Sequence, residues 1–364
     1  MPANRDHRSA ERPNSGNAGG QDDRVPTSWV GRQKWVGHQI WLRGLVMLAL
    51  ALPPTVGVLS DASGAHTPAA RSTALQSPRP RPAVRHAIKT VFLIVMENYD
   101  WSDIKGNPSA PYINHALLPR ASHAEQYYNP PGNHPSLPDY LWLEAGTNFG
   151  IGDDDNPSVH HLGTTHHLVT LLRHAGISWK AYQEGISGTV CPLTGNDSYA
   201  PKHDPFVYFD DVTGGNNPRS AYCIAHVRPY TQLASDLRHN TVARYNFITP
   251  NLCNDMHDRC SPLNNAVKQG DTWLSRQVPL ILRSQAYKKG GALFITWDEG
   301  NDHSDGPIGL LVLSPVARGH GYANTIHYTH SSMLRTLEVI FGVKPLLGGA
   351  AHVTDLHNLF TAYP

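Results

Sequence analysis

Oxygen-bearing side chains directly follow two apolar stretches of the sequence. The run 91–96 ends at the pair Glu97-Asn98, and a second apolar run ends at the pair Asp298-Glu299. Carboxylate and amide oxygens are the ligands that hard divalent cations prefer in proteins. The alternative is that these side chains cap helices or face water. Two adjacent pairs, each after its own apolar run, favour a metal site.

A third polar segment follows the weaker apolar run 245–248. This segment, 250–258, contains Asp255, His257 and Asp258. Ligands of open α/β sheets bind outside the carboxyl ends of the strands. We therefore expect three strand ends to bring carboxylates, an amide and an imidazole to one edge of a sheet.

Ser136 has the surroundings of a possible nucleophile. It lies just before a predicted helix start, with Pro138 in the first turn. Free backbone N–H groups and the helix dipole favour an anion there, and a metal at the same place would lower the pKa of the hydroxyl. The alternative is an ordinary serine N-cap.

Apolar runs and helical stretches alternate along the chain and must position these residues. The predicted strands are 91–96, 245–248, 292–297 and 308–313. The predicted helices are 168–174, 271–282 and 331–341. Continuous apolar runs indicate strands buried on both faces, and the alternation predicts an α/β domain with a mostly parallel sheet sandwiched by helices.

Six short motifs resemble those of a bacterial phosphoesterase family within the alkaline phosphatase superfamily. They occur in the family's order, at 96–98, 134–140, 202–206, 254–258, 296–299 and 330–338. This family groups secreted acid phosphatases with phosphatidylcholine-type phospholipases C. The chain is most similar to the short secreted acid phosphatases that act on phosphoinositides. The resemblance covers about residues 90–342 and implies an alkaline-phosphatase-like fold.

The resemblance also implies roles for the matching residues. The implied ligands of a divalent metal are Glu97, Asn98, Ser136, Asp298 and Glu299. The implied phosphate-binding residues are His134, His203, Asp255, His257 and His330. Ser136 would attack phosphorus and form a phosphoserine, His134 would assist, and His257 is the predicted general acid. One metal is the family's simpler arrangement. A second metal on Asp255, His257 and His330 stays open, and the ion's identity is not fixed.

Some polar residues have simpler interpretations. Asp139 stands where the family commonly has Asn, so it either adds charge near the phosphate or caps the turn. The loop 300–306 is expected to be a solvated turn rather than an extra metal-contacting loop, and 153–155 a solvated loop. We expect surface exposure for His160, His161, His166 and His167.

The first 87 residues have the composition of a leader and a linker. Residues 1–65 combine a polar, disordered start, a basic patch, the apolar run 44–59 and small residues, which is the pattern of a secretory signal peptide. An uncleaved signal-anchor is the alternative, and both would export the chain. The proline-rich segment 66–87 is expected to be an extended linker, followed by one catalytic domain, 88–364. The predicted location is therefore extracellular.

Four cysteines lie in the exported part, an even number that favours two disulfides in an oxidising compartment. Cys253–Cys260 would close a short loop, which leaves Cys191–Cys223. A zinc cluster is the alternative, but no CxxC pair is present.

Composition limits the partners. Lys and Arg number 30 against 29 Asp and Glu, a net charge of +1 that argues against a polybasic nucleic-acid binder. The 22 histidines indicate metal or phosphate chemistry.

The leading hypothesis is a secreted, metal-dependent phosphomonoesterase whose partner is a phosphate ester, such as phosphatidylinositol 3-phosphate or another phospholipid. No stable membrane span is expected once the signal is cleaved. A phospholipase C is the first alternative. The larger enzymes of that type carry long C-terminal extensions, and this sequence ends soon after its last motif. The second alternative is an exported binding module that has lost catalysis.

Overall fold

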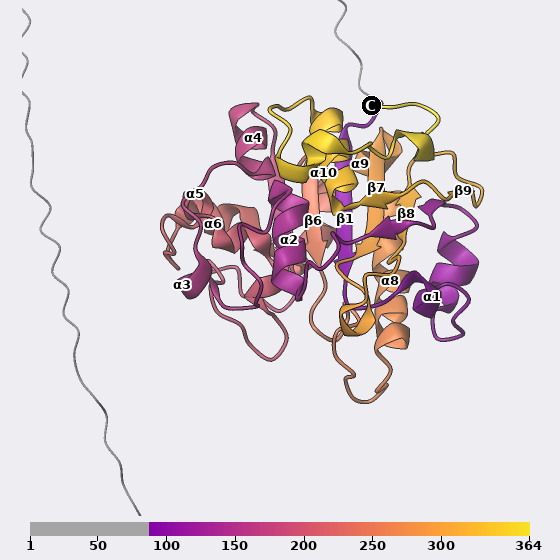
Figure 1. The fold of residues 1–364 in the computed structure, drawn as a ribbon, viewed down its shortest axis with the longest axis horizontal. Helices are drawn as coiled ribbons and strands as arrows, with labels where there is room; N and C mark the ends of the chain where they lie inside the picture. The colour runs from indigo at the N-terminus through magenta and orange to yellow at the C-terminus, as the bar shows by residue number, and fades with distance from the viewer. Residues whose placement is uncertain (1–86) are drawn as a thin grey trace, which may run out of the picture. The chain divides into compact units, whose positions relative to one another are not determined.

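The computed structural model describes residues 87–364 (Figure 1). The predicted leader, 1–65, and all but the last residue of the predicted linker, 66–87, lie outside the described residues. The first strand begins at Thr90.

An eight-stranded sheet forms the centre of the domain. In spatial order its strands are β5 (Val227–Pro229), β4 (Trp179–Gln183), β6 (Tyr245–Thr249), β1 (Thr90–Met96), β7 (Gly291–Trp297), β8 (Leu310–Leu313), β2 (Ser122–Ala124) and β9 (Ala323–Asn324). All neighbours are parallel except β8, which is antiparallel to β7 and β2. Two short strands, β3 (Tyr127–Tyr128) and β10 (Tyr328–Thr329), pair separately. The prediction of a mostly parallel sheet is confirmed.

Each of the four predicted strands is present. β1 pairs with β6 on one side and β7 on the other, and its apolar side chains from Val91 to Met96 are all buried. β8 begins two residues later than expected. Gly309, directly before it, has φ of 76°, and a Cβ there would lie 2.3 Å from the Trp101 ring. The chain turns at this glycine before it can join the sheet.

Ten α-helices connect or flank these strands in the described part of the chain. They are α1 (Trp101–Ile104), α2 (Ser136–Ala145), α3 (Pro157–His160), α4 (Leu168–His174), α5 (Asp210–Thr213), α6 (Ala221–His226), α7 (Thr231–His239), α8 (Ala266–Arg283), α9 (Gln285–Lys288) and α10 (His330–Phe341). Short 3-10 helices include Pro201–His203 and Asn301–His303.

The helices form two packed groups. α2, α4 and α10 pack against one another, and α8 packs against α7 and α9. In Figure 1, α2 and α10 lie in front of the strands and α8 lies behind them. α8 begins five residues before the predicted helix because Asn265 caps it, its Oδ1 accepting from Lys268 N at 2.9 Å.

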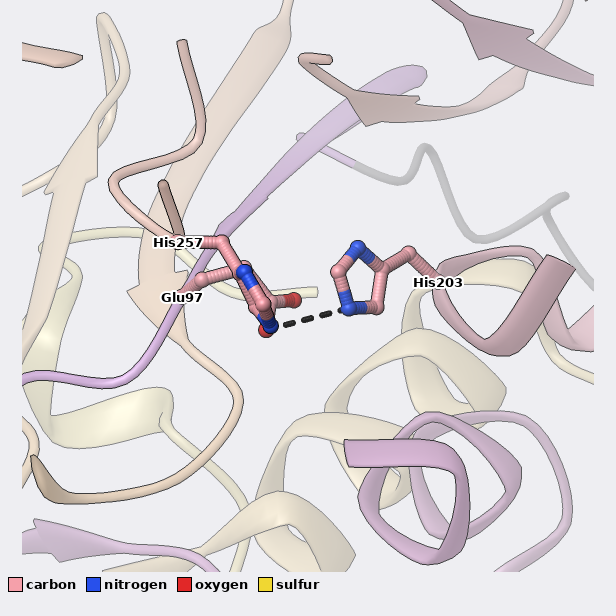
Figure 2. Close-up of side chains that lie close together, drawn as sticks. All are labelled: Glu97, His203 and His257. Atoms are coloured by element: carbon pink, nitrogen blue, oxygen red, sulfur yellow. Dashed lines mark ion pairs between the residues drawn. The ribbon is translucent and has the colours of Figure 1, made fainter. Parts of the chain in front are cut away.

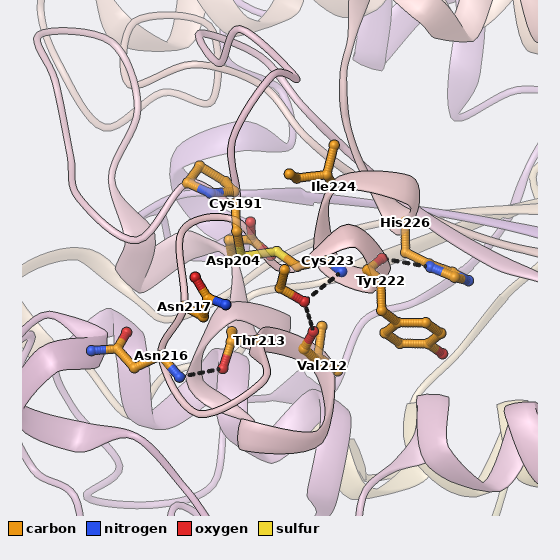
Figure 3. The surroundings of a disulfide bond; sticks show 12 residues. Cys191, Asp204, Val212, Thr213, Asn216, Asn217, Tyr222, Cys223, Ile224 and His226 are labelled. Atoms are coloured by element: carbon orange, nitrogen blue, oxygen red, sulfur yellow. Dashed lines mark hydrogen bonds between the residues drawn. A yellow bond between two sulfur atoms is a disulfide. The ribbon is translucent and has the colours of Figure 1, made fainter.

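Both predicted disulfides are present, Cys191–Cys223 and Cys253–Cys260, with Cα separations of 5.5 and 5.7 Å. All four cysteines are used, so the zinc alternative is wrong. Figure 3 shows that Cys191–Cys223 ties a loop to α6, with Thr213 and Asn216 nearby. Among residues 87–364, no helix is long and apolar enough to cross a membrane.

Candidate active site

The polar ends of β1 and β7 lie side by side because these strands are parallel neighbours. Asp298 N donates to Met96 O at 2.9 Å, and Asn98 N donates to Asp298 Oδ1 at 3.1 Å. The pairs Glu97-Asn98 and Asp298-Glu299 therefore meet at one edge of the sheet.

The segment after β6 joins the same edge. Glu97 N donates to Asp255 O at 2.8 Å, and His257 N donates to Asp255 Oδ1 at 2.8 Å. The Cys253–Cys260 disulfide closes this loop on either side of Asp255 and His257. The three strand ends thus come together, as their positions in the sequence predicted.

Ser136 is the first residue of α2, not its N-cap. The cap position is Pro135, whose side chain offers no capping hydrogen bond. Ser136 Oγ instead donates to Glu97 Oε2 at 3.3 Å. The N-cap interpretation of Ser136 is therefore wrong, and its hydroxyl points at the acidic end of β1.

Glu97 is fully buried yet surrounded by cationic groups (Figure 2). His203 Nε2 lies 3.2 Å from Glu97 Oε2, and the Tyr140 hydroxyl donates to the other carboxylate oxygen. Burial alone would raise the pKa of Glu97, but the charges of His203 and His257 outweigh it and lower the pKa to about 2. Glu97 is thus held as a carboxylate.

His203 is the cationic partner of this carboxylate. Burial alone would lower its pKa, but Glu97 on one ring nitrogen and Asp255 on the other raise it to about 9. His203 Nδ1 lies 3.5 Å from Asp255 Oδ2, and the ring stacks on Tyr140. The predicted phosphate-binding residues His203 and Asp255 therefore form a buried layer behind Glu97.

His257 has one ring nitrogen held and the other turned toward the cleft. Nδ1 lies 2.8 Å from Asp258 Oδ1, and Nε2 lies 3.4 Å from Lys202 Nζ. Lys202 Nζ also donates to Asp154 Oδ2 at 2.8 Å. An imidazole oriented in this way can transfer a proton through Nε2.

Three further carboxyl groups crowd the same region. Burial and the negative charge of Glu97 raise the pKa of Asp298 well above its usual range. Burial likewise raises the pKa of Asp139 well above its usual range, and that of Glu299 to a lesser degree. Asp139 accepts from Asn133 Nδ2 at 2.8 Å and does not cap α2. It therefore adds an acidic group to the cluster.

The cluster has the chemistry of a cation site. Asp139 and Asp298 each keep a buried carboxyl oxygen that has no hydrogen-bond partner in the described part of the chain. Buried carboxylates without partners are costly, and a divalent cation removes that cost. The oxygen-rich donor set, with histidines at its border, fits a divalent metal.

His134 and the loop 300–306 border the cluster on its exposed side. His134 Nδ1 lies 2.5 Å from Glu299 Oε2, and its Nε2 lies 3.0 Å from Asp305 Oδ1. His303 Nδ1 lies 3.5 Å from the same Glu299 oxygen. The loop is largely exposed, as expected, but it also closes one side of the site.

His330 lies below the cluster rather than at the surface. Its side chain is fully buried, Nε2 donates to Asp298 O at 2.6 Å, and Nδ1 lies 3.0 Å from the Tyr127 hydroxyl. Burial lowers the pKa of His330 to about 4. A neutral His330 therefore supports the end of β7.

A cleft of about 350 Å³ opens above these residues. Its walls include Asn98, Ser136, Lys202, His257, Arg259 and Glu299. Five of these six residues belong to the predicted site or its motifs. The sixth, Arg259, lies outside the motifs.

Two expectations about loop residues are wrong. His167 is not exposed: it is buried between Glu144 and Asp211, with its ring stacked on Phe209. Asp154 is not merely solvated, since it accepts from Leu137 N at 3.0 Å and pairs with Lys202. Their partners are far away in sequence, so no local pattern could have revealed these contacts.

Comparison with known proteins identifies the family of this chain. A model of the Phosphoesterase family matches residues 123–344. Phosphatidylinositol-3-phosphatase of Mycobacterium tuberculosis is 30% identical over 270 residues, which is 74% of this chain and 82% of that protein. Phosphate-repressible acid phosphatase of Penicillium chrysogenum is 31% identical over 223 residues, 59% of this chain and 51% of that protein. The chain thus spans about half the length of that fungal relative.

Solved structures align with this chain at low sequence identity. A Bacteroides thetaiotaomicron protein from a study of glycosaminoglycan metabolism aligns with a TM-score of 0.50 and 11% identity, covering 75% of this chain and 82% of its own. An alkaline phosphatase superfamily protein from Vibrio parahaemolyticus aligns with a TM-score of 0.49 and 11% identity, covering 75% and 72%. The extent of the family match and the identity to the mycobacterial phosphatase establish that this chain belongs to the Phosphoesterase family.

Proposed function

We propose that this protein is an exported, metal-dependent phosphomonoesterase that hydrolyses phosphate esters through a phosphoserine on Ser136. The observation that carries the proposal is the Ser136 hydroxyl, which donates a hydrogen bond to Glu97. Ser136 lines the cleft, and buried acidic groups lie beside it. The relatives named as an acid phosphatase and a phosphatidylinositol-3-phosphatase support a monoester substrate, and a phosphoinositide is the candidate lipid. Two disulfides support an oxidising compartment.

The metal would be held by the acidic end of the sheet and the serine. The proposed ligands are Glu97, Asn98, Ser136, Asp298 and Glu299. A bound divalent ion would favour the ionised serine oxygen and offset the negative charge of the phosphoryl group. One ion is the simplest arrangement for this ligand set.

Ser136 is the proposed nucleophile. The Ser136 hydroxyl loses its proton to water, and its Oγ forms a bond to phosphorus while the bond from phosphorus to the leaving oxygen breaks. The leaving oxygen takes a proton from His257, and water later hydrolyses the phosphoserine to serine and inorganic phosphate. Glu97 accepts the hydrogen bond of the hydroxyl and so orients the oxygen.

His257 is the proposed acid for the leaving oxygen. Asp258 holds Nδ1, which leaves Nε2 to deliver the proton into the cleft. His134 borders the phosphoryl position through its contact with Glu299, and the cation on His203 supplies positive charge behind Glu97. His330 and Asp255 support this layer from below.

The test measures product release by the full chain, with and without a chelator. The substrates are an aryl phosphate, a phosphoinositide monophosphate and phosphatidylcholine. We expect chelator-sensitive phosphate release from the two monoesters. Release of choline phosphate from phosphatidylcholine at a matching rate would replace the proposal with a phospholipase C, and no product from any substrate would reject both.

A further inference from the structure

Arg259 is a cationic side chain at the mouth of the candidate active site. It lines the same cleft as Ser136 and His257. It lies inside the loop closed by Cys253–Cys260, next to Asp258, and is exposed. Residues 87–364 provide no ion pair or side-chain hydrogen bond to its guanidinium. Its charge therefore faces the cleft and solvent.

The other basic groups of the cleft already have acidic neighbours. Lys202 Nζ pairs with Asp154 at 2.8 Å, and His257 Nδ1 lies 2.8 Å from Asp258 Oδ1. His303 Nδ1 lies 3.5 Å from Glu299 Oε2. Arg259 lines the cleft wall together with Tyr99. The free positive charge thus sits on the wall, apart from the paired groups around the nucleophile.

The size and polarity of the cleft limit what can enter it. At about 350 Å³, it is near the lower end of ligand pockets, which start at roughly 300 Å³. A phosphorylated ring or polyol fits such a volume, whereas acyl chains would stay outside. A second anionic group on the substrate would then lie at the mouth, where Arg259 lies.

We propose that Arg259 binds a second phosphoryl group of the substrate, one that is not hydrolysed. The inference rests on the proposed phosphomonoesterase function and narrows its substrate class to esters with two separated phosphoryl groups. A guanidinium suits this task because its planar N–H groups match two phosphate oxygens at once. The second group could be the phosphodiester of a phosphoinositide or the other phosphate of a soluble bisphosphate.

The experiment compares three substrates on the full chain. They are an inositol monophosphate, an inositol bisphosphate and a soluble short-chain phosphoinositide monophosphate. The variants are Arg259→Gln, Arg259→Lys and, as a control, Arg219→Gln, which removes an exposed arginine that does not line the cleft. The readouts are kcat, KM and the inhibition constant of inorganic phosphate.

We expect Arg259→Gln to raise KM about five- to tenfold for substrates with a second phosphoryl group, the size of one charge-assisted contact. The kcat values, the monophosphate KM and the inhibition constant should stay within about twofold, and Arg259→Lys should be intermediate because it keeps the charge without the planar group. If Arg259→Gln raises KM for the bisphosphate alone, the second group is the other phosphate of a soluble substrate. If it raises KM for the lipid alone, the second group is the phosphodiester.

Two results would overturn the inference. One is a KM that Arg259→Gln leaves unchanged for both substrates with two phosphoryl groups. The other is an equal rise in KM for the inositol monophosphate. In either case a wild-type chain that still releases phosphate would leave the phosphomonoesterase proposal intact. A wild-type chain that releases no phosphate from any of the three substrates would reject the proposed function and this inference together.

Discussion

Glu97 illustrates, at the scale of the residue, how a buried side chain can remain charged. Its carboxylate receives hydrogen bonds from Ser136 and Tyr140 and faces the cation on His203. Burial alone would raise the pKa of Glu97, but the charge and hydrogen bond of His203, with the charges of His257 and Lys202, lower it to about 2. Asp298, one strand away, accepts only the backbone hydrogen bond of Asn98 among residues 87–364, and burial with the negative charge of Glu97 raises its pKa. The two carboxyl groups thus differ because of their neighbours alone.

The proposed nucleophile predicts a clear loss of activity. Ser136→Ala removes the attacking oxygen and should lower kcat by roughly a thousandfold or more. The melting temperature should change little, since the hydrogen bond to Glu97 is lost but four of the five proposed metal ligands remain. The matched control is Ser158→Ala, an exposed serine outside the cleft. Retention of a tenth of the activity in Ser136→Ala would remove Ser136 from this role.

The proposed acid predicts a dependence on the leaving group. His257→Asn removes the transferable proton, so kcat should fall by about a hundredfold for an alkyl phosphate, whose leaving oxygen needs protonation. An activated aryl phosphate needs less help and should lose less than about tenfold. His239→Asn, an exposed histidine on α7, is the control. Equal losses on both substrates would assign the proton to another group.

At the scale of the element, the two disulfides have different consequences. Cys191–Cys223 spans 32 residues and lies by α6, whereas Cys253–Cys260 spans 7 residues and holds the loop of the candidate site. Cross-links over longer loops remove more entropy from the unfolded chain. Stability and activity should therefore depend on different disulfides.

Paired Cys→Ser variants test this division. Loss of Cys191–Cys223 should cost about 3–4 kcal/mol of unfolding free energy, against about 2–3 kcal/mol for Cys253–Cys260. Loss of Cys253–Cys260 should cause the larger fall in kcat, because it frees the loop that positions His257. Denaturant melts rank the two variants by stability, and phosphate release ranks them by kcat. A larger fall in kcat on loss of Cys191–Cys223 would show that the loop closed by Cys253–Cys260 does not position a catalytic group.

Glu338 on α10 should make stability depend on pH. Its side chain is buried and accepts from Leu347 N at 2.7 Å, and burial raises its pKa from 4.5 to about 7. A raised folded-state pKa gives stability that is complete below the unfolded pKa and is lost as the pH rises through the folded pKa. The loss should therefore develop between pH 4.5 and about 7.

The variant Glu338→Gln isolates this effect because it keeps an acceptor and cannot ionise. The melting temperature of the wild type, relative to the variant, should fall as the pH is raised from about 5 to about 8. Thermal melts of both proteins in the same buffers provide the comparison. A difference that is constant across this range would mean that Glu338 does not titrate there.

At the scale of the whole molecule, the acidic cluster couples cation binding to the stability of the domain's central strands. β1 and β7 each end in it, and α2 begins beside it. A cation bound only by the folded chain would stabilise the entire domain by mass action. Metal content should therefore be visible in the global stability of the protein.

Chelation should lower the melting temperature by several degrees, since the buried carboxyl groups lose their counter-charge. Dialysed protein, with its metal measured by elemental analysis, should recover on addition of the ion that was removed. Mg²⁺, Ca²⁺, Mn²⁺ and Zn²⁺ added separately would identify it. Metal-free protein with an unchanged melting temperature would argue against a cation in the cluster.

The sequence by itself predicted four of the eight strands of the sheet and the meeting of their polar ends. Short β-branched apolar runs such as 91–96 favour buried strands, and parallel neighbours place Glu97 and Asp298 at one edge of the sheet. The spacing of the cysteines also predicted both disulfides. These are local patterns, and periodicity and chain direction are enough to interpret them.

Tertiary structure alone decided which distant side chains share the site. It paired Lys202 with Asp154, buried His167 between two acids, and turned the Ser136 hydroxyl toward Glu97. It also placed Arg259 on the cleft wall. Such contacts join segments that are distant along the chain, and side-chain packing fixes them only after the strands and helices have assembled. No spacing within one segment can reveal them.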